Sequence, residues 1–556
     1  MRPGFSATLR LALLLALASV LAPEAFGQGI HMRLRANANP FPAHHRYANV
    51  WGDGNYAYVG SYTATGVLIF DISNPDSPVL VANYADPGHD SMLEDVEVKN
   101  GVGYFASNYK GGIHIVDVSN PAQPKLITRI TSAMGGWDSV HTLLLDGNHL
   151  YLPHFQVDPY VQVWNVSNPA APFLIQTFKT TDSRSIRAMS ILNNHLFTSG
   201  YGGHTDIWDV TNIDTVPPTL LGTINSGLNS HSSSPTSDGH YLVSSEEFEA
   251  KGGLVKIFDI SDPANPVQVS MITMSAFGID AVSPHNPMVM GNILYHSWYQ
   301  AGVLAFDITD PAHPVMVGNY DTWPGKVIWG QYDGDWGVYP YLGQDRVLLS
   351  DQDTGLYIVD ATGVSADPVL FNYKVAPSTL PGSWPATATA FLLGLAPTGG
   401  LTVNVSTVGP VSTNPTITIP SGAHSASEAV GTSPVSEKTP ATLTAAYNNV
   451  QISAPMTILP PIPAKVVFLT NPVTGGQKTL VRVLMQGPVA VDTTVALSVL
   501  QGASAVKSIP SQVVVPKGHS TVVFTLFTNP VTTQTIVVVQ ATANGGAATG
   551  SLTVNP

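Results

Sequence analysis

Short runs in which apolar and polar residues alternate recur along most of the chain, separated by Gly, Pro, Asn and Asp. A period of two residues is typical of β-strands with one buried face, and the separating residues are those that form tight turns. Charged residues make up only 11% of the sequence, so little of it suits amphipathic helices. The pattern predicts an all-β protein.

One of these runs occurs seven times. Residues 67–75 form an apolar strand that ends at Asp71 and is followed by Ser73 and Pro75. Related copies lie at residues 113–121, 161–169, 206–212, 255–263, 303–311 and 356–362. The acid or amide that ends each strand is residue 71, 117, 165, 209, 259, 307 or 360, so the copies are 44 to 53 residues apart. That period is typical of a four-stranded blade and predicts a seven-bladed β-propeller over residues 28–374.

Each repeat divides in the same way into an inner strand, a second strand, the motif strand and an outer strand. In the third repeat these are residues 141–145, 149–152, 161–165 and 173–178. The alternating apolar residues are expected to pack between blades, while the Asp and Ser or Thr bond to local backbone and Pro forces the turn. The motif residues are therefore interpreted as structural.

The repeats resemble those of the LVIVD-repeat family, whose name matches the run Leu356-Tyr357-Ile358-Val359-Asp360 and its six relatives. The resemblance covers roughly residues 45–374. It implies an exported or cell-surface propeller, and it brings no established catalytic residues. Two segments remain alternatives for the outer strand of the seventh blade: residues 369–374 and the N-terminal residues 31–37.

After residue 374 the composition shifts to Thr, Val, Ser, Pro and Ala. Residues 420–422, 446–448 and 456–458 align with residues 516–518, 542–544 and 552–554, always 96 residues apart, which indicates a tandem duplication. Alternating runs between Pro and Gly turns predict two β-sandwiches, over residues 375–460 and 461–556. They look like bacterial immunoglobulin-like surface modules.

The first 27 residues have the layout of a secretory signal peptide: Arg2 and Arg10, an apolar run at residues 11–21, and small residues for cleavage at 25–27. We therefore expect a secreted or cell-surface protein with no membrane span after signal cleavage. Cysteine is absent, which rules out disulfides and thiolate metal sites and favours a bacterial source.

The net charge of −14 is concentrated in the repeats. The tail after residue 374 carries +3 and the signal segment +1, which leaves −18 on residues 28–374. Such a surface repels phosphate backbones and anionic lipid headgroups, so the charge predicts no nucleic-acid partner. Cations or neutral polymers suit this charge better.

Superposed repeats place a polar residue near the start of five inner strands. These residues are Glu94, His141, Arg187, His231 and His285, with Asp95 and Asn286 beside them. In a propeller this position lies at one mouth of the central channel, where the seven side chains are candidates for binding a ligand. His141, His231, His285 and Glu94 are also candidate ligands for a divalent cation such as zinc. The alternative is that these side chains bind water or link neighbouring blades.

Three further features have less specific interpretations. Residues 351–355 resemble the start of a calcium loop, although a turn explains them equally well. Glu246, Glu247 and Glu249 are interpreted as a solvated edge. An aromatic cluster over residues 298–336 is expected to be buried between blades, with an exposed binding face as the alternative.

No catalytic motif appears, so the leading hypothesis is an exported, noncatalytic binding or scaffolding protein whose propeller presents a ligand face. Its partner is expected to be a protein or a carbohydrate at the cell surface. One rival is a metal-dependent propeller hydrolase or lyase that uses the channel-mouth residues. A second rival is an adhesin that acts through residues 375–556.

Overall fold

The computed structural model describes residues 29–42, 46–63, 66–85, 92–227, 230–247, 253–323 and 325–556. The signal segment predicted for residues 1–27 lies outside these ranges. Apart from four short 3-10 turns, all regular structure in them is β-strand, and no helix there could cross a bilayer. The prediction of an all-β protein is confirmed.

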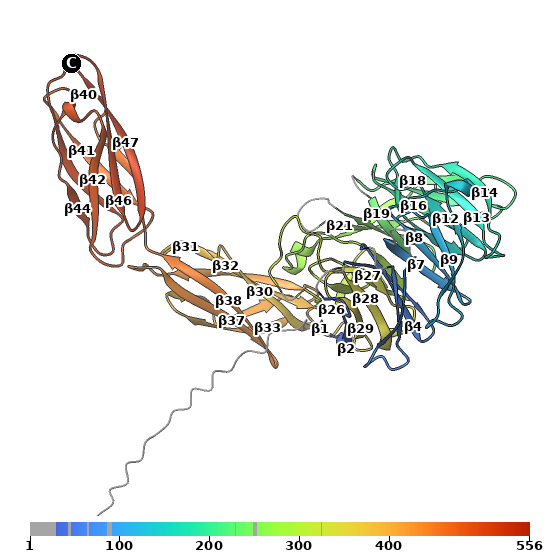
Figure 1. The fold of residues 1–556 in the computed structure, drawn as a ribbon. Helices are drawn as coiled ribbons and strands as arrows, with labels where there is room; N and C mark the ends of the chain where they lie inside the picture. Colours follow the sequence, from blue (N-terminus) through green and yellow to red (C-terminus); the bar gives the residue numbers. More distant parts are fainter. Residues whose placement is uncertain are drawn as a thin grey trace, which may run out of the picture.

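Residues 29–360 form seven sheets of four or five strands (Figure 1). The first two contain β3 (Tyr47–Asp53), β4 (Tyr56–Ser61), β5 (Val67–Asp71) and β6 (Val79–Tyr84), then β7 (Leu93–Lys99), β8 (Val102–Ser107), β9 (Ile113–Asp117) and β10 (Lys125–Ile130). The next two contain β11 (Leu144–Asp146), β12 (His149–Pro153), β13 (Tyr160–Asn165) and β14 (Phe173–Lys179), then β15 (Ile186–Leu192), β16 (His195–Gly200), β17 (His204–Asp209) and β18 (Thr219–Asn225).

The fifth sheet contains β19 (Ser230–Pro235), β20 (Tyr241–Glu246), β21 (Leu254–Asp259) and β22 (Val267–Ile272). The sixth contains β23 (Pro287–Met290), β24 (Ile293–Ser297), β25 (Val303–Asp307), β26 (Val315–Tyr320) and β1 (Gly29–Ile30), and the seventh β27 (Asp335–Tyr339), β28 (Val347–Asp351), β29 (Gly355–Asp360) and β2 (Arg33–Ala38). Neighbouring strands within each sheet are antiparallel.

Apolar clusters join each sheet to the next, as expected if both faces of every sheet are buried. One further cluster joins the last sheet to the first: Tyr47 and Val59 of the first sheet pack with Leu348 and Ile358 of the seventh. The seven sheets therefore close into a ring, consistent with a β-propeller, and we call this part of the protein the seven-sheet ring.

The repeated motif has a single structural role. In all seven copies the carboxylate or amide oxygen of the residue that ends the motif strand accepts the N–H of the residue two positions later, as in Asp71 with Ser73 at 2.8 Å. This bond closes a turn that leads to the outer strand. The sequence-based interpretation of the motif as structural agrees with this geometry.

The N-terminal segment supplies the outer strand of the seventh sheet. Strand β2 pairs with β29, and Arg33 Nη2 lies 2.9 Å from Asp360 Oδ2 at the start of this pairing. Residues 369–374, the other candidate, lie in β30 (Val369–Ala376), which pairs with a strand of the C-terminal part. The two ends of the repeat region are thus joined by backbone hydrogen bonds.

The C-terminal part contains two bodies, each built from two sheets. In the first, β30, β32 (Ala386–Leu393), β36 (Ser425–Thr432) and β34 (Val411–Ser412) face β31 (Thr379–Pro381), β38 (Val450–Leu459), β37 (Thr439–Tyr447), β33 (Leu401–Val408) and β35 (Thr416–Ile419). In the second, β39 (Pro463–Phe468), β41 (Lys478–Met485), β45 (Thr521–Thr528) and β43 (Val506–Ser508) face β40 (Val473–Thr474), β47 (Gly546–Asn555), β46 (Thr535–Ala543), β42 (Thr493–Gln501) and β44 (Gln512–Val515). Each body has its own apolar core, and the strand order is the same in both.

The first C-terminal body is packed against the seven-sheet ring. Leu393, from β32, is fully buried in the core between the fifth and sixth sheets of the ring. Nearby, the rings of Phe277 and His424 stack with centroids 5.1 Å apart, and Lys374 Nζ lies 2.9 Å from Asp280 Oδ1. The two bodies extend away from the ring in an elongated arrangement (Figure 1).

Candidate functional site at the centre of the ring

β-Bulges in the innermost strands direct polar side chains to the ring centre. In β7, Leu93 and Asp95 pair with Ser107 and Ala106, which leaves Glu94 as the extra residue. The same irregularity in β15, β19 and β27 involves Arg187, His231 and Trp336. A bulge re-aims a side chain without breaking the sheet, so one backbone device repeated around the ring collects these four residues.

His285 and His141 reach the centre from just outside their strands. The His285 N–H donates to Ser297 O at 2.9 Å, and the Ser297 N–H donates to Asn286 O at 3.1 Å. His285 and Asn286 therefore both lie opposite Ser297, as two residues lie opposite one in a β-bulge. His141 lies three residues before β11, although the sequence predicted that this strand begins there.

A cavity of about 550 Å³ opens at the centre, lined by residues in or beside the strands of all seven sheets. They are Arg46, Tyr62, Asn108, His141, Phe155, Gln156, Arg187, Tyr201, Glu247, Tyr299, Tyr332, Trp336 and Gln352. A smaller adjoining cavity, about 20 Å³ in volume, is lined by every candidate residue from the sequence: Glu94, Asp95, His141, Arg187, His231, His285 and Asn286. The structure thus brings the seven candidates together. We call the larger space the central cavity.

Glu94 and His141 form a buried pair. Glu94 Oε2 lies 2.6 Å from His141 Nδ1, and Asn108 donates to Glu94 Oε1 at 2.7 Å. Burial raises the pKa of Glu94 to about 8, against the lowering effects of the Asn108 hydrogen bond and the Arg187 charge. A carboxyl with this pKa beside an imidazole can hold or release a proton near neutral pH.

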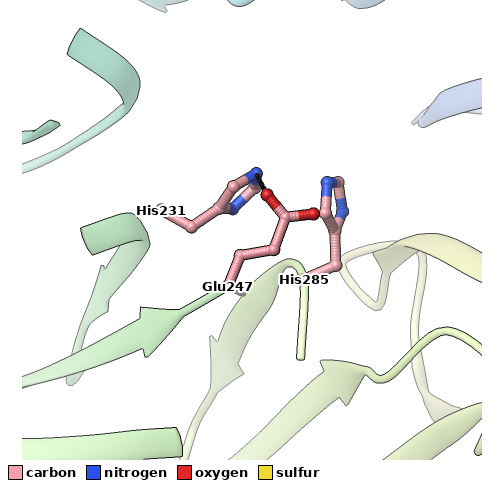
Figure 2. A group of neighbouring side chains, drawn as sticks. All are labelled: His231, Glu247 and His285. Atoms are coloured by element: carbon pink, nitrogen blue, oxygen red, sulfur yellow. Dashed lines mark ion pairs between the residues drawn. The ribbon is translucent and has the colours of Figure 1, made fainter. Parts of the chain in front are cut away.

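His231 and His285 meet a different carboxylate. His231 and His285 each contribute a ring nitrogen and Glu247 a carboxylate oxygen, and these three atoms lie within 4.8 Å of one another. All three side chains are buried. Figure 2 shows the Glu247 carboxylate between the two imidazole rings, with His231 Nε2 3.4 Å from Glu247 Oε2. Two of the four candidate metal ligands, His231 and His285, thus lie beside Glu247, which was not a candidate. The other two, Glu94 and His141, form a separate pair.

The sequence-based interpretation of the acidic loop was wrong for the two acids that the structure describes. Glu246 and Glu247 are 1% and 2% exposed, and Glu246 Oε1 lies 2.6 Å from Lys256 Nζ; Glu249 lies outside the described residues. Glu247 directly follows the second strand of its sheet, and the residues at this place in other sheets also line the central cavity. They are Tyr62, Asn108, Tyr201 and Gln352. Superposing the repeats on the ends of their second strands would have revealed Glu247.

Arg187 is buried and no carboxylate contacts its guanidinium directly, although Glu94 and Glu247 interact with its charge from beyond ion-pair distance. Its side chain is 4% exposed and makes no ion pair with any residue in the described ranges. Its guanidinium carbon lies 6.0 Å from the centroid of Tyr201 and 5.9 Å from that of Trp336, within the range of cation–π contacts. These contacts only partly replace the water that a guanidinium loses on burial.

The aromatic cluster is divided between core and surface. Trp298 is fully buried in a core between two sheets, as predicted. Tyr299 and Trp336 are 1% and 6% exposed but line the central cavity, and Trp329 is 48% exposed. The Tyr299 hydroxyl donates to Glu247 Oε1. Tyr299 and Trp336 therefore form part of the cavity wall.

Residues 351–355 form a turn. Asp351 Oδ1 accepts the N–H groups of Asp353 at 3.0 Å and Thr354 at 2.9 Å, which accounts for the pattern that resembles a calcium loop.

The pattern of the LVIVD repeat family matches residues 47–86, 93–132, 250–273 and 288–322. Four stretches of the chain thus match the LVIVD repeat. These matches fall on the first, second, fifth and sixth sheets of the seven-sheet ring.

No curated protein sequence matches the chain. Among solved structures, it is similar to a computationally designed protein, Ika8, with 14% identity over 56% of this chain and 82% of that one, and a TM-score of 0.37. It is also similar to a chain of a mitotic checkpoint complex, with 18% identity over 48% of this chain and 74% of that one, and a TM-score of 0.37.

Proposed function

We propose that the protein is an exported binding protein whose seven-bladed propeller binds a carbohydrate with a carboxylate group in the central cavity. In this proposal the two C-terminal bodies are immunoglobulin-like β-sandwiches that hold the propeller away from the cell surface. The observation that carries the proposal is the buried guanidinium of Arg187, which makes no direct ion pair with a carboxylate among the described residues.

A buried charge without a directly bonded counter-ion is unfavourable, and a ligand carboxylate bonded to Arg187 would reduce this penalty. Arginine also suits this role because its planar fork donates two parallel hydrogen bonds to a carboxylate. Arg187 lines both the central cavity and the smaller space beside it, so a bound carboxylate can reach it from the open side.

The remaining lining favours a sugar over a protein partner. Six aromatic side chains face the central cavity, and sugar rings pack their apolar faces on such surfaces while amide groups bond to hydroxyls. The aromatic residues are Tyr62, Phe155, Tyr201, Tyr299, Tyr332 and Trp336, and the amides are Asn108, Gln156 and Gln352. A cavity of about 550 Å³ holds a short oligosaccharide and excludes a folded protein domain.

The charge of −18 on the repeats opposes the approach of an acidic ligand from a distance. At physiological ionic strength this repulsion is screened beyond about 8 Å, so contacts inside the cavity decide the affinity. We therefore expect slow association and an affinity that depends on Arg187.

The test is isothermal titration calorimetry of the full chain with trigalacturonic acid and with the neutral trisaccharide maltotriose. We expect binding of the acidic sugar alone, and at least ~10-fold weaker binding by Arg187→Met, which loses a charge-assisted hydrogen bond. Arg184→Met is the matched control, because Arg184 is an exposed arginine that also lies near Tyr201. Equal binding of both sugars, no binding of either, or an unchanged affinity in Arg187→Met contradicts the proposal.

A second candidate function is cleavage of the bound sugar by a hydrolase or lyase reaction. The observation in its favour is the Glu94–His141 pair beside the central cavity, with its proton affinity near neutral pH. Incubation with polygalacturonic acid, followed by assay of new reducing ends, tests it. Turnover that Glu94→Gln abolishes would establish the enzyme, and the absence of turnover leaves a binding protein.

A further inference from the structure

We propose that His231, His285 and Glu247 bind one zinc ion, with an open coordination position toward the central cavity. Nothing in the repeat pattern requires these residue types, since the structural role of the repeat lies in the motif strands. The site is independent of the proposed carbohydrate ligand.

The spacing of the donor atoms suits a shared ion. His231 Nε2 and Glu247 Oε2 are 3.4 Å apart, and two ligands of a tetrahedral zinc with bonds of about 2.0 to 2.1 Å lie about 3.3 Å apart. Atoms from all three residues fall within 4.8 Å of one another, so small side-chain rotations would complete the geometry. Two imidazoles and a carboxylate are a donor set that zinc accepts when water fills the fourth position.

The other nitrogen of each imidazole has a partner of its own. His285 Nδ1 lies 2.5 Å from Trp336 O, which accepts its proton and leaves Nε2 as the lone-pair atom. His231 Nδ1 lies 3.1 Å from Ser232 Oγ, whose hydroxyl donates to His285 O at 2.6 Å, so Oγ accepts from Nδ1–H. A metal-binding histidine is usually fixed in this way, with the remote nitrogen bonded to a carbonyl or hydroxyl.

The carboxylate is held in the same manner. The Tyr299 hydroxyl donates to Glu247 Oε1, and Oε2 remains free on the side of His231. Each of the three residues therefore has one bonded polar atom and one available atom, and the Glu247 carboxylate lies between the two imidazole rings (Figure 2).

These available atoms lack hydrogen-bond partners in the part of the chain that the structure describes, and only His231 Nε2 and Glu247 Oε2 approach each other as an ion pair at 3.4 Å. His285 Nε2, His231 Nε2 and Glu247 Oε2 are buried and make no hydrogen bond with any described residue. Buried polar atoms are nearly always bonded, so three orphaned atoms at one point call for a missing ligand. Burial and the charge of Arg187 lower the pKa values of His231 and His285 well below the usual range, and neutral imidazole is the form that binds metals.

The donor set also selects among cations. Calcium and magnesium prefer oxygen ligands in larger number, whereas two imidazole nitrogens suit zinc and similar transition metals. Calcium, the other cation considered from the sequence, therefore does not suit this site.

The experiment is metal analysis of the full chain by elemental mass spectrometry, after loading with zinc chloride and dialysis against metal-free buffer. We expect about one zinc per chain, and a more than ~100-fold loss of affinity in His285→Ala and Glu247→Gln by competition with a chromophoric chelator. His240→Ala is the matched control, because His240 faces Asp238 at 3.5 Å on the exposed surface of the same sheet. His141→Ala, which alters the neighbouring pair, should also keep its zinc.

Less than about 0.1 zinc per chain, full zinc retention in His285→Ala, or equal loss in His141→Ala would overturn the assignment. X-ray absorption spectroscopy of the zinc-loaded unaltered chain provides a test that does not depend on the variants folding. A shell of two imidazoles with oxygen ligands supports the site, and a shell of oxygen alone or of three imidazoles refutes it. Metal content is measured without sugar, so failure here and failure of sugar binding are distinguishable.

Discussion

Glu94 Oε2 lies 2.6 Å from His141 Nδ1 inside the seven-sheet ring, where both side chains are more than nine-tenths buried. The residues are 47 positions apart in the sequence and come from adjacent sheets. Burial raises the pKa of the Glu94 carboxyl to about 8. Its ionisation therefore lowers the free energy of unfolding, which is opposite to the effect of most surface acids.

We expect Glu94 to destabilise the ring as the pH rises from about 4.5 to about 8. The folded state keeps the Glu94 proton up to its raised pKa, whereas the unfolded state releases it near its usual pKa, so unfolding is favoured increasingly across this window. The full effect is roughly 4 to 5 kcal/mol in unfolding free energy. Glu94→Gln should therefore stabilise the ring at pH 8.5 much more than at pH 5.

Urea unfolding of the chelator-treated protein at the two pH values measures this difference. Tryptophan fluorescence reports on the ring, since eight of the nine tryptophans precede residue 375. An equal effect of Glu94→Gln at both pH values would show that Asn108, His141 and Arg187 keep Glu94 ionised when folded.

The N-terminal strands should stabilise the ring through one buried side chain. Met32, between β1 and β2, is 3% exposed and packs in the core between the sixth and seventh sheets. Met32→Ala should lower the unfolding free energy of the ring by about 2 to 4 kcal/mol, because it leaves a cavity there. Arg33→Ala removes an ion pair whose arginine is 72% exposed, so it should have an effect below about 1 kcal/mol. Similar effects of the two variants in urea would contradict this account of ring closure.

The junction between the ring and the first C-terminal body depends on Leu393. Its side chain is fully buried in the core of the ring although its backbone belongs to β32. Leu393→Ala should lower the Tm of the ring and increase tryptic cleavage near residue 374, with a loss of about 2 to 4 kcal/mol. Leu395→Ala is the control, because Leu395 is 37% exposed and its truncation should change the unfolding free energy by no more than about 0.5 kcal/mol. A Tm that Leu393→Ala leaves unchanged would mean that the two parts are not coupled.

The second C-terminal body should fold alone. All buried residues of its core lie between Val466 and Val554, and none comes from the first body. A fragment of residues 461–556 should therefore unfold in one cooperative transition by circular dichroism. Trp384 Nε1 donates to Gln486 O across the boundary, and Trp384→Ala should leave the Tm of this body unchanged within about 2 °C in the full chain. A fragment without a cooperative transition would show that the first body is needed for folding.

Local sequence patterns predicted much of this architecture because the interactions concerned are local. The Asp or Asn at the end of each motif strand accepts a hydrogen bond from the residue two positions later. The repeated sequence pattern therefore directly specifies the turn. The 96-residue offset likewise relates β37 to β46 and β38 to β47 residue for residue. The position of Glu94, Arg187 and His231 near the ring centre followed from superposing repeats.

The sequence by itself determined an all-β chain with seven repeats, a duplicated tail and a convergence of polar residues at one place. Only the tertiary structure decided which strand closes the ring and which side chains meet, because hydrogen bonding between residues as far apart as Arg33 and Asp360 leaves no local signal. β-Bulges rotate Glu94 toward His141, while a strand end in another sheet brings Glu247 between His231 and His285. Such rotations depend on backbone pairing across sheets, and a repeat alignment does not record them.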